Sequence, residues 1–428
     1  MRALYTIIIS VYGLFLKLSS LFNQKARDWF YGRKNLFSKL EEVFKAHYTE
    51  DNPKPVIWIH CASLGEYEQG RPIIENIKKK FPEFSVLLTF FSPSGFNNKS
   101  ASSEADYVFY LPIDTRKNAK RFVRLASPAI AIFIKYEFWF NYLNELHKHN
   151  VPVYTVSAIF RPEQHFFKWY GGWFRKHLRQ MKQIFVQDEE SAELLSMIDI
   201  NNVKVSGDTR FDRVTEIMFY ATEIPLIESF LKDKKVLVAG STWPADEDLL
   251  KELFKAMQGS LTMIIAPHEV NAGHIKEVKQ KFNGNCILYS ELENSTLANE
   301  QMPDVLIIDS IGLLSRIYKY ADMAYIGGGF GVGIHNTLEA AVYGIPVLFG
   351  PNYIRFKEAR ELIKQEGAIS IKTADELITV VNSFLTNPEK LYNYSEASGN
   401  YVIERRGATR IIMDELESHI SEVISRQY

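Results

Sequence analysis

From residue 55 onward, the sequence repeatedly alternates short apolar runs with longer amphipathic stretches, and this pattern constrains the fold most strongly. The short runs are rich in β-branched and aromatic residues. Most are apolar nearly throughout, which is typical of strands buried on both faces of a sheet. Such strands, separated by helices, form parallel sheets with helices on both sides. We therefore expect an α/β fold with doubly wound, Rossmann-like sheets.

The expected strands form two groups, one in each half of the chain. Those of the first half are 56–60, 84–91, 106–112, 130–135, 152–158, 183–187 and 202–207, and those of the second half are 235–240, 262–267, 285–290, 304–309, 323–328 and 345–350. A length of 428 residues also favours two domains. We place their boundary near Val214, which gives domains at 25–213 and 214–400. A helical segment, 401–428, is expected to cross back to the first domain.

Two doubly wound domains of this kind are expected to turn the carboxyl ends of both sheets toward a central cleft, where ligands bind. This arrangement favours an enzyme with two substrates. The formal net charge of -1 provides no overall basic field for nucleic acid. The two cysteines, Cys61 and Cys286, lie far apart, which indicates a reducing compartment without a disulfide framework or a cysteine metal site.

Residues 1–24 contain an apolar helix that we expect to associate with a membrane. Its uninterrupted apolar part ends at Leu16, which is short for a spanning helix, and no clear cleavage site follows. The next residues, 23–39, are rich in Lys and Arg, so the body of the protein is expected on the cytoplasmic side. A spanning anchor, a helix lying in the membrane interface and a core helix of the first domain all remain open.

A glycine-rich segment, 325–353, follows an expected strand and fits neither a dinucleotide fingerprint nor a Walker loop. Its glycines either admit a ligand close to the main chain or pack a tight strand–helix crossing. Asn336 and Thr337 are favourable helix N-cap residues, and Glu339 lies one turn further, where it can accept hydrogen bonds from ribose hydroxyls. Two more strand-end loops, 240–248 and 310–314, also suit nucleotide groups.

Two carboxylates of the first half are candidate catalytic groups. Glu66 follows a strand and opens a helix, so it either faces the cleft as a general base or is an ordinary first-turn glutamate. Glu137 lies just past another strand, between aromatic residues. Arg210, near the domain junction, can neutralise a phosphate or form an interdomain salt bridge.

Residues 161–182 mix Arg and Lys with Phe, Trp and Tyr. This mixture suits an anionic membrane surface or a phosphorylated lipid better than nucleic acid, although a helical hairpin with aromatic core contacts would also produce it. The residues that we expect to contact the membrane or the acceptor are Lys168, Trp169, Trp173, Arg175 and Lys176.

The motifs together resemble a known family, the 3-deoxy-D-manno-octulosonic acid (Kdo) transferases of lipid A assembly, which have the GT-B glycosyltransferase fold. The matching segments cover nearly the whole chain in a consistent order. They are HCASLGE (60–66), YEFWFN (136–141), SGDTRFD (206–212), AGST (239–242), APHE (266–269) and GGGFGVGIHNTLEAAVYGIPVLFGPNY (327–353).

The resemblance implies transfer of Kdo from CMP-Kdo to the lipid A precursor, lipid IVA, with inversion and without a metal or other cofactor. It implies that 25–213 binds the acceptor and 214–400 the CMP-sugar, at the cytoplasmic face of the inner membrane. Glu66 would accept the proton, and Glu137 and Arg210 would stabilise the transition state. The expected CMP contacts are Ser241, Thr242, Pro267, His268, Ile311, Gly312, Leu313, Asn336, Thr337, Leu338 and Glu339.

The chain departs from the family pattern at several positions. Arg210 replaces a lysine, Pro267 an arginine and Leu313 a glutamate, while Trp243 and Pro244 replace a turn that contains histidine. Two alternatives stay open. One is another GT-B enzyme, such as a UDP-sugar transferase or an epimerase. The other is a membrane-bound nucleotide-binding module without catalysis, which the presence of Glu66 disfavours.

Overall fold

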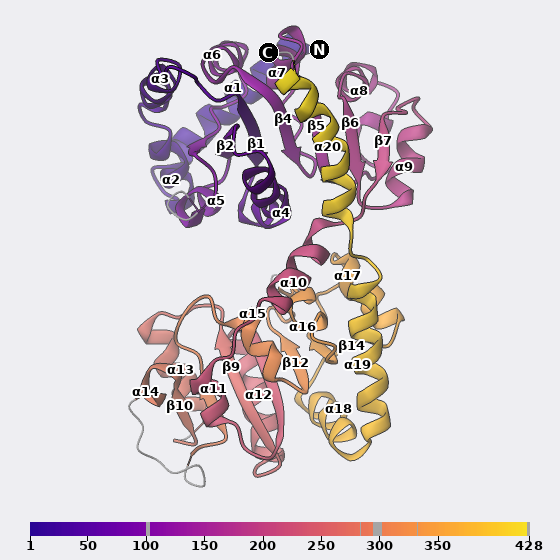
Figure 1. Cartoon of the computed structure of the whole chain (residues 1–428). Helices are drawn as coiled ribbons and strands as arrows, with labels where there is room; N and C mark the ends of the chain where they lie inside the picture. Colours follow the sequence, from indigo (N-terminus) through magenta and orange to yellow (C-terminus); the bar gives the residue numbers. More distant parts are fainter. Residues whose placement is uncertain (100–102, 283, 294–301, 332, 426–428) are drawn as a thin grey trace. The chain divides into compact units, whose positions relative to one another are not determined.

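The computed structural model (Figure 1) describes residues 1–99, 103–282, 284–293, 302–331 and 333–425. The chain divides into two compact units. Unit 1 combines Met1–Arg213 with Gly407–Tyr428, and unit 2 is Val214–Arg406. The chain therefore passes from unit 1 to unit 2 at Val214, where the sequence analysis places the domain boundary. It passes back to unit 1 at Gly407, six residues beyond residue 401, where the sequence analysis expects this.

Unit 1 contains a parallel seven-stranded sheet in the order β3-β2-β1-β4-β5-β6-β7. Its strands are β1 (Val56–Cys61), β2 (Ser85–Phe90), β3 (Tyr107–Tyr110), β4 (Pro128–Ile134), β5 (Val153–Ala158), β6 (Gln183–Val186) and β7 (Val203–Val205). The order reverses between the neighbouring strands β1 and β4. Every residue of β1 and β2 is buried, as the near-continuous apolar runs predict.

Helices cover both faces of this sheet. They are α1 (Arg2–Ser19), α2 (Gln24–Gly32), α3 (Leu36–His47), α4 (Leu64–Lys80), α5 (Pro93–Lys99), α6 (Arg116–Ala126), α7 (Phe140–Lys148), α8 (Gly172–Arg179), α9 (Glu189–Ser196), the start of α10 (Thr209–Phe219) and α20 (Ala408–Ser425). Successive β1 residues point to opposite faces, so Trp58 joins the core that includes Phe122 of α6, and Ile57 joins the core that includes Ile74 of α4 and Leu416 of α20.

Unit 2 contains a second parallel seven-stranded sheet, in the order β10-β11-β9-β8-β12-β13-β14. Its strands are β8 (Lys235–Thr242), β9 (Leu261–Pro267), β10 (Cys286–Leu288), β11 (Val305–Ile307), β12 (Met323–Ile326), β13 (Val347–Phe349) and β14 (Ala368–Ser370). Its helices are α11 (Pro225–Phe230), α12 (Pro244–Ala256), α13 (Ala272–Lys281), α14 (Tyr289–Leu292), α15 (Leu314–Ile317), α16 (Leu338–Ala341), α17 (Lys357–Lys364), α18 (Ala374–Thr386) and α19 (Pro388–Ile403). The order reverses between β8 and β12, and the two sheets confirm the α/β fold.

Helix α1 is attached to the body of unit 1 along one side. Its Arg2 Nη2 lies 3.0 Å from Glu145 Oε1, and its Tyr5 hydroxyl donates to the buried Asp114 carboxylate at 2.7 Å. The Tyr5 ring also packs against Phe140. The other side of α1 carries apolar side chains that are more than half exposed, namely Leu4, Ile7, Ile8, Val11, Leu14, Phe15 and Leu18. By length and composition, this helix would be able to cross a membrane.

Candidate active site

The two candidate carboxylates of unit 1 lie at the reversal point of its sheet. Glu66 stands in the first turn of α4, which follows β1, and Glu137 follows β4. Ligands of doubly wound sheets bind at this position because the connections leave neighbouring strand ends uncovered. Ser63 Oγ donates to Glu66, and Lys135 Nζ lies 3.6 Å from Glu66 Oε1. The side chains of Glu66 and Glu137 are 14% and 20% exposed.

The electrostatics of this pair favour acid–base chemistry. Burial, and then the neighbouring Glu66 carboxylate, raise the pKa of Glu137 to about 7, although Lys135 lowers it. Glu137 therefore exchanges a proton near neutral pH. Two carboxyl groups side by side in different environments commonly take different roles in proton transfer.

His60, the first residue of the HCASLGE motif, lies beside Glu137 and is buried. Its Nε2 accepts a hydrogen bond from the Trp139 indole at 3.0 Å and lies 4.0 Å from Glu137 Oε2. Its Nδ1 lies 2.9 Å from Thr89 Oγ1. Burial lowers the pKa of His60 to about 3, so the ring is neutral and Nδ1 carries the proton. His60 was absent from the predicted site, although its place in the motif was a signal.

Arg210 lies in the first turn of α10 and is connected to α4 by hydrogen bonds through Asp208. Its Nε donates to Asp208 Oδ2 at 2.8 Å, and Asp208 Oδ1 accepts a hydrogen bond from Gln69, one turn beyond Glu66. Burial alone would raise the pKa of the Asp208 carboxyl, but the Arg210 guanidinium holds it below its ordinary value. Unit 1 therefore brings Glu66 and Glu137 together. It also holds Arg210 close to α4, the helix that carries Glu66, through hydrogen bonds that involve Asp208 and Gln69.

In unit 2, the predicted CMP residues follow four adjacent strands, β11, β9, β8 and β12. Asn336 and Glu339 lie beyond β12, where Asn336 Nδ2 donates to Glu339 Oε1 at 3.0 Å and Asn336 Oδ1 accepts from the Leu338 backbone N–H at 3.2 Å. Thr337 is fully buried. Ser241 and Thr242 end β8 beside them, across the reversal point, and Ser241 has a positive φ of 54°.

The remaining predicted residues lie on the neighbouring loops. His268 follows Pro267 at the end of β9, and its backbone N–H donates to Thr242 O at 2.9 Å. In the loop 311–313, Ile311 is 86% exposed and Gly312 has a φ of 97°. The loop leads into α15, whose Leu314 packs against Gly240 near the end of β8. The strand order thus gathers loops that are far apart in the sequence.

Most glycines of the glycine-rich segment, 325–353, allow close packing of the backbone. A Cβ on Gly327 would lie 2.3 Å from Ser241 O, and one on Gly329 would lie 2.5 Å from Gly350 Cα. Gly328 has a φ of 91°, a backbone conformation that residues with a side chain rarely adopt. Of the two roles left open by the sequence, the structure supports the tight crossing for these positions.

Three stacked rings join the loops after β8, β9 and β12. Trp243 stacks on His268 at 4.7 Å between ring centroids, and His268 stacks on His335 at 4.4 Å. The Trp243 indole also donates to His335 Nε2 at 3.1 Å. Burial, and then His268, lower the pKa of His335 to about 4, so His335 is a neutral acceptor. The departure from the family pattern at Trp243 was a signal for this stack, and so was the place of His335 in the motif at 327–353, directly before Asn336.

The five residues predicted to contact the membrane occupy different environments. Trp169 is 93% exposed, and Lys176 is also exposed. Trp173 instead packs against Tyr5 and Phe140, so it helps to attach α1. Arg175 donates to the Phe166 carbonyl, and Lys168 is half-buried. Membrane contact by these residues stays a prediction.

Among the described residues, no group of three or more His, Cys, Asp or Glu side chains is arranged to hold a metal ion.

Comparisons with known proteins agree with this architecture. A family model described as 3-deoxy-D-manno-octulosonic-acid transferase (kdotransferase) matches residues 38–213. A 3-deoxy-D-manno-octulosonic acid transferase of Rickettsia bellii is 27% identical over 384 residues, which cover 87% of this chain and 89% of that protein. One of Aquifex aeolicus is 28% identical over 356 residues, with 81% and 91% covered.

The fold also matches solved structures of the GT-B class. UDP-GlcNAc 2-epimerase from Neisseria meningitidis, bound to UDP-GlcNAc, superposes with a TM-score of 0.59 at 16% identity, covering 85% of this chain and all of that one. This likeness concerns the fold alone, whereas the two transferases align over most of the chain and the family model includes the HCASLGE segment (60–66). Over most of its length, the chain is therefore similar to 3-deoxy-D-manno-octulosonic acid transferases, which are glycosyltransferases, and it has the GT-B fold.

Proposed function

We propose that this protein transfers Kdo from CMP-Kdo to a hydroxyl of the lipid A precursor, lipid IVA, in lipopolysaccharide biosynthesis. The reaction inverts the anomeric configuration, requires no metal and takes place at the cytoplasmic face of the inner membrane. The observation that carries this proposal is the pair Glu66 and Glu137 at the reversal point of the unit 1 sheet, in a chain similar to Kdo transferases.

Glu66 is the proton acceptor in the proposed reaction. A hydroxyl is a poor nucleophile until its proton is removed, and Glu66 stands in the first turn of α4, where the helix dipole favours a negative charge. The acceptor oxygen forms a bond to the anomeric carbon of Kdo while the bond from that carbon to the CMP phosphate oxygen breaks. The hydroxyl proton goes to Glu66, and the electron pair leaves with CMP.

Glu137 and Arg210 respond to the charges that develop in this step. The anomeric carbon gains positive charge, which the carboxylate form of Glu137 stabilises, and the departing phosphate gains negative charge, which the Arg210 guanidinium counters. Because the pKa of Glu137 is about 7, this form predominates only above neutral pH. In unit 2, the loops that carry Ser241, His268 and Asn336 to Glu339 hold CMP.

The test is direct transfer by the purified full chain. The protein is incubated with CMP-Kdo and tetra-acylated lipid A precursor, with EDTA and without added metal, and the lipid mass is followed. We expect the gain of one or more Kdo masses, and a rate at least about 100-fold lower for Glu66→Ala. Glu68→Ala, on the same helix, is the matched control and should retain activity.

Other outcomes separate the parts of the proposal. Equal transfer by wild type and Glu66→Ala would remove Glu66 from its role but keep the transferase. Loss of transfer in EDTA that added metal restores would contradict metal independence. A folded protein that binds CMP and transfers nothing would exclude lipid IVA as the acceptor, and binding of UDP in preference to CMP would favour a UDP-sugar enzyme.

A further inference from the structure

An apolar groove of about 650 Å³ lies on unit 1 between α1, α2 and the start of α5. Its volume is within the range of ligand pockets. The walls are mainly aromatic and aliphatic, and the side chains that matter here are Tyr12, Phe15, Phe22, Trp29, Phe91 and Pro93. Phe15 and Phe22 are 64% and 91% exposed, so the groove opens onto the exposed apolar side of α1.

The wall of the groove is continuous with the candidate active site. Phe91 packs against Trp29 on the groove side and against Trp139 on the other, at 4.6 Å between ring centroids. Trp139 in turn donates to His60, which lies beside Glu137. The backbone of Phe91 and Ser92 also donates to the carbonyl of Ala62, four residues before Glu66. The groove and the carboxylate pair thus share one wall.

The lining of the groove favours an acyl chain as its occupant. Trp29 is 8% exposed and packs its ring against Phe91, which leaves an apolar wall. An acyl tail that lies against this wall removes apolar surface from water. Lys25, at the rim of the groove, adds a positive charge for an anionic lipid.

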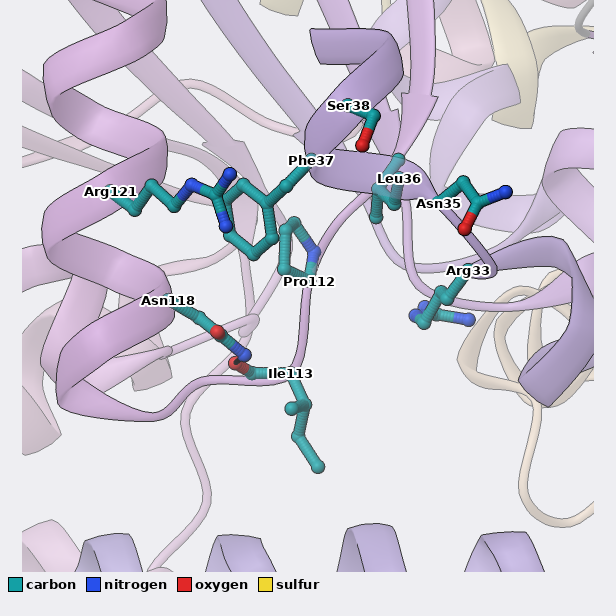
Figure 2. A pocket seen from close by; sticks show the side chains of 9 residues that line it. All are labelled: Arg33, Asn35, Leu36, Phe37, Ser38, Pro112, Ile113, Asn118 and Arg121. Atoms are coloured by element: carbon teal, nitrogen blue, oxygen red, sulfur yellow. Dashed lines mark hydrogen bonds between the residues drawn. The ribbon is translucent and has the colours of Figure 1, made fainter. Parts of the chain in front are cut away.

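A second hollow nearby, of about 340 Å³, is less suited to a ligand (Figure 2). Arg121 lies over the Phe37 ring and binds Glu41 at 2.7 Å. Arg33 donates to the carbonyls of Trp29, Phe91 and Leu111, and its guanidinium stacks on Trp29. Both cations of this hollow are thus already engaged, and Arg33 acts by holding the wall of the neighbouring groove.

We propose that the groove between α1 and α2 binds one acyl chain of the lipid acceptor and so presents the head group beside Glu66 and Glu137. The inference rests on the proposed function, because that function defines the acceptor. An acyl chain enters from the membrane that covers the exposed side of α1 and lies against Phe91 and Trp29.

The first experiment blocks the groove with a matched pair of variants. Ser19 lines the groove, whereas Ser10 is exposed nine residues earlier, on the opposite side of the same helix. We expect Ser19→Trp to raise the KM for tetra-acylated lipid A precursor by about tenfold, the effect of losing a few apolar contacts. The KM for the fully deacylated acceptor should not change, and Ser10→Trp should match wild type with both acceptors.

The second experiment does not need turnover. A tetra-acylated precursor with a diazirine in one acyl chain is photolysed with each protein, and the labelled peptides are identified by mass spectrometry. We expect label on residues 12–29 and 91–93 in wild type and Ser10→Trp, and its loss from these residues in Ser19→Trp.

The outcomes separate the two proposals. Transfer by wild type with an unchanged KM in Ser19→Trp, or label that persists at the groove in Ser19→Trp, would overturn the groove assignment alone. Absence of transfer by wild type would overturn the proposed function, and the labelling pattern would still decide whether the groove takes an acyl chain. Equal labelling of the groove by a diazirine phosphatidylglycerol would assign it to bulk lipid instead.

Discussion

Among single residues, Glu137 is the one whose environment most affects pH dependence. Its folded-state pKa of about 7 lies above the ordinary value of 4.5 because the carboxyl group is buried beside Glu66. Between these values the folded chain holds a proton that the unfolded chain has lost, so stability falls as the pH rises through about 7. The full shift corresponds to about 3 kcal/mol.

We therefore expect Glu137→Gln to stabilise unit 1 at pH 8 but not at pH 4. Denaturant unfolding followed by tryptophan fluorescence measures this well, because five of the six tryptophans lie in unit 1. The wild type should lose up to about 3 kcal/mol relative to the variant between these pH values. Glu83→Gln, at an exposed position, is the control. Parallel pH profiles for wild type and Glu137→Gln would contradict the raised pKa.

Sequence reasoning found the carboxylates but not what surrounds them. Glu66 and Glu137 follow apolar strands, and a polar residue at a strand end is visible in the sequence. The neutral His60 beneath them depends on contacts with Thr89 and Trp139, from other parts of the chain. The packing of Gly327 against Ser241 is likewise a tertiary contact between segments more than 80 residues apart.

Among the secondary structure elements, α20 depends on a residue of the SGDTRFD motif. The two oxygens of Asp212 accept the backbone N–H groups of Gly407 and Thr409, each at 2.6 Å, at the start of this helix. Asp212 thus acts as a helix cap supplied from α10 and satisfies donors that would otherwise be unpaired. The SGDTRFD motif thus contains both a structural residue, Asp212, and a candidate functional residue, Arg210, two positions earlier.

We expect Asp212→Ala to destabilise unit 1 by about 1–2 kcal/mol, as loss of a helix cap does. For a unit of this size, the melting temperature should fall by about 2–8 °C. Asp212→Asn keeps one acceptor oxygen and should show a smaller decrease. Calorimetry of the three proteins measures the effect, and equal melting temperatures would show that water replaces the cap without cost.

The elements themselves were largely predictable, because thirteen of the strands lie within runs of apolar residues that are visible in the sequence. Strand β14 was missed because its sequence, AIS, contains a single large apolar residue, Ile369, and no apolar run marks it. Helix α16 is only four residues long, and it follows Asn336 and Thr337, where the sequence predicts a helix. Short elements of this kind are defined by their neighbours rather than by a pattern of their own.

For the whole molecule, the division into units is discontinuous in sequence, with unit 2 inserted between two parts of unit 1. Helix α20 supplies Ile412, Leu416 and Ile420 to the core beneath β1. The apolar pattern of this helix is visible in the sequence, but the sheet it packs on is not. The positive-inside pattern and the apolar α1 likewise suggest a membrane without specifying how α1 contacts it.

We expect Leu416→Ala to destabilise unit 1 by about 2–5 kcal/mol, because this side chain is fully buried. Hydrogen exchange should accelerate in α20 and α4, whereas α19 of unit 2 should keep its protection. Ser418→Ala, at an exposed position on the same helix, is the control. Faster exchange in α19 as well would show that the two units unfold together.

The return of the chain to unit 1 has a consequence for synthesis on the ribosome. Unit 2 is continuous and can fold as soon as it has emerged, whereas unit 1 lacks α20 until residues 408–425 have been made. At about 5–20 residues per second, the interval after residue 213 lasts on the order of ten seconds or more. During that time, the part of this apolar face that α20 covers is exposed, although α4 already packs on the rest, so nascent unit 1 is a natural client for a chaperone that shields apolar surface.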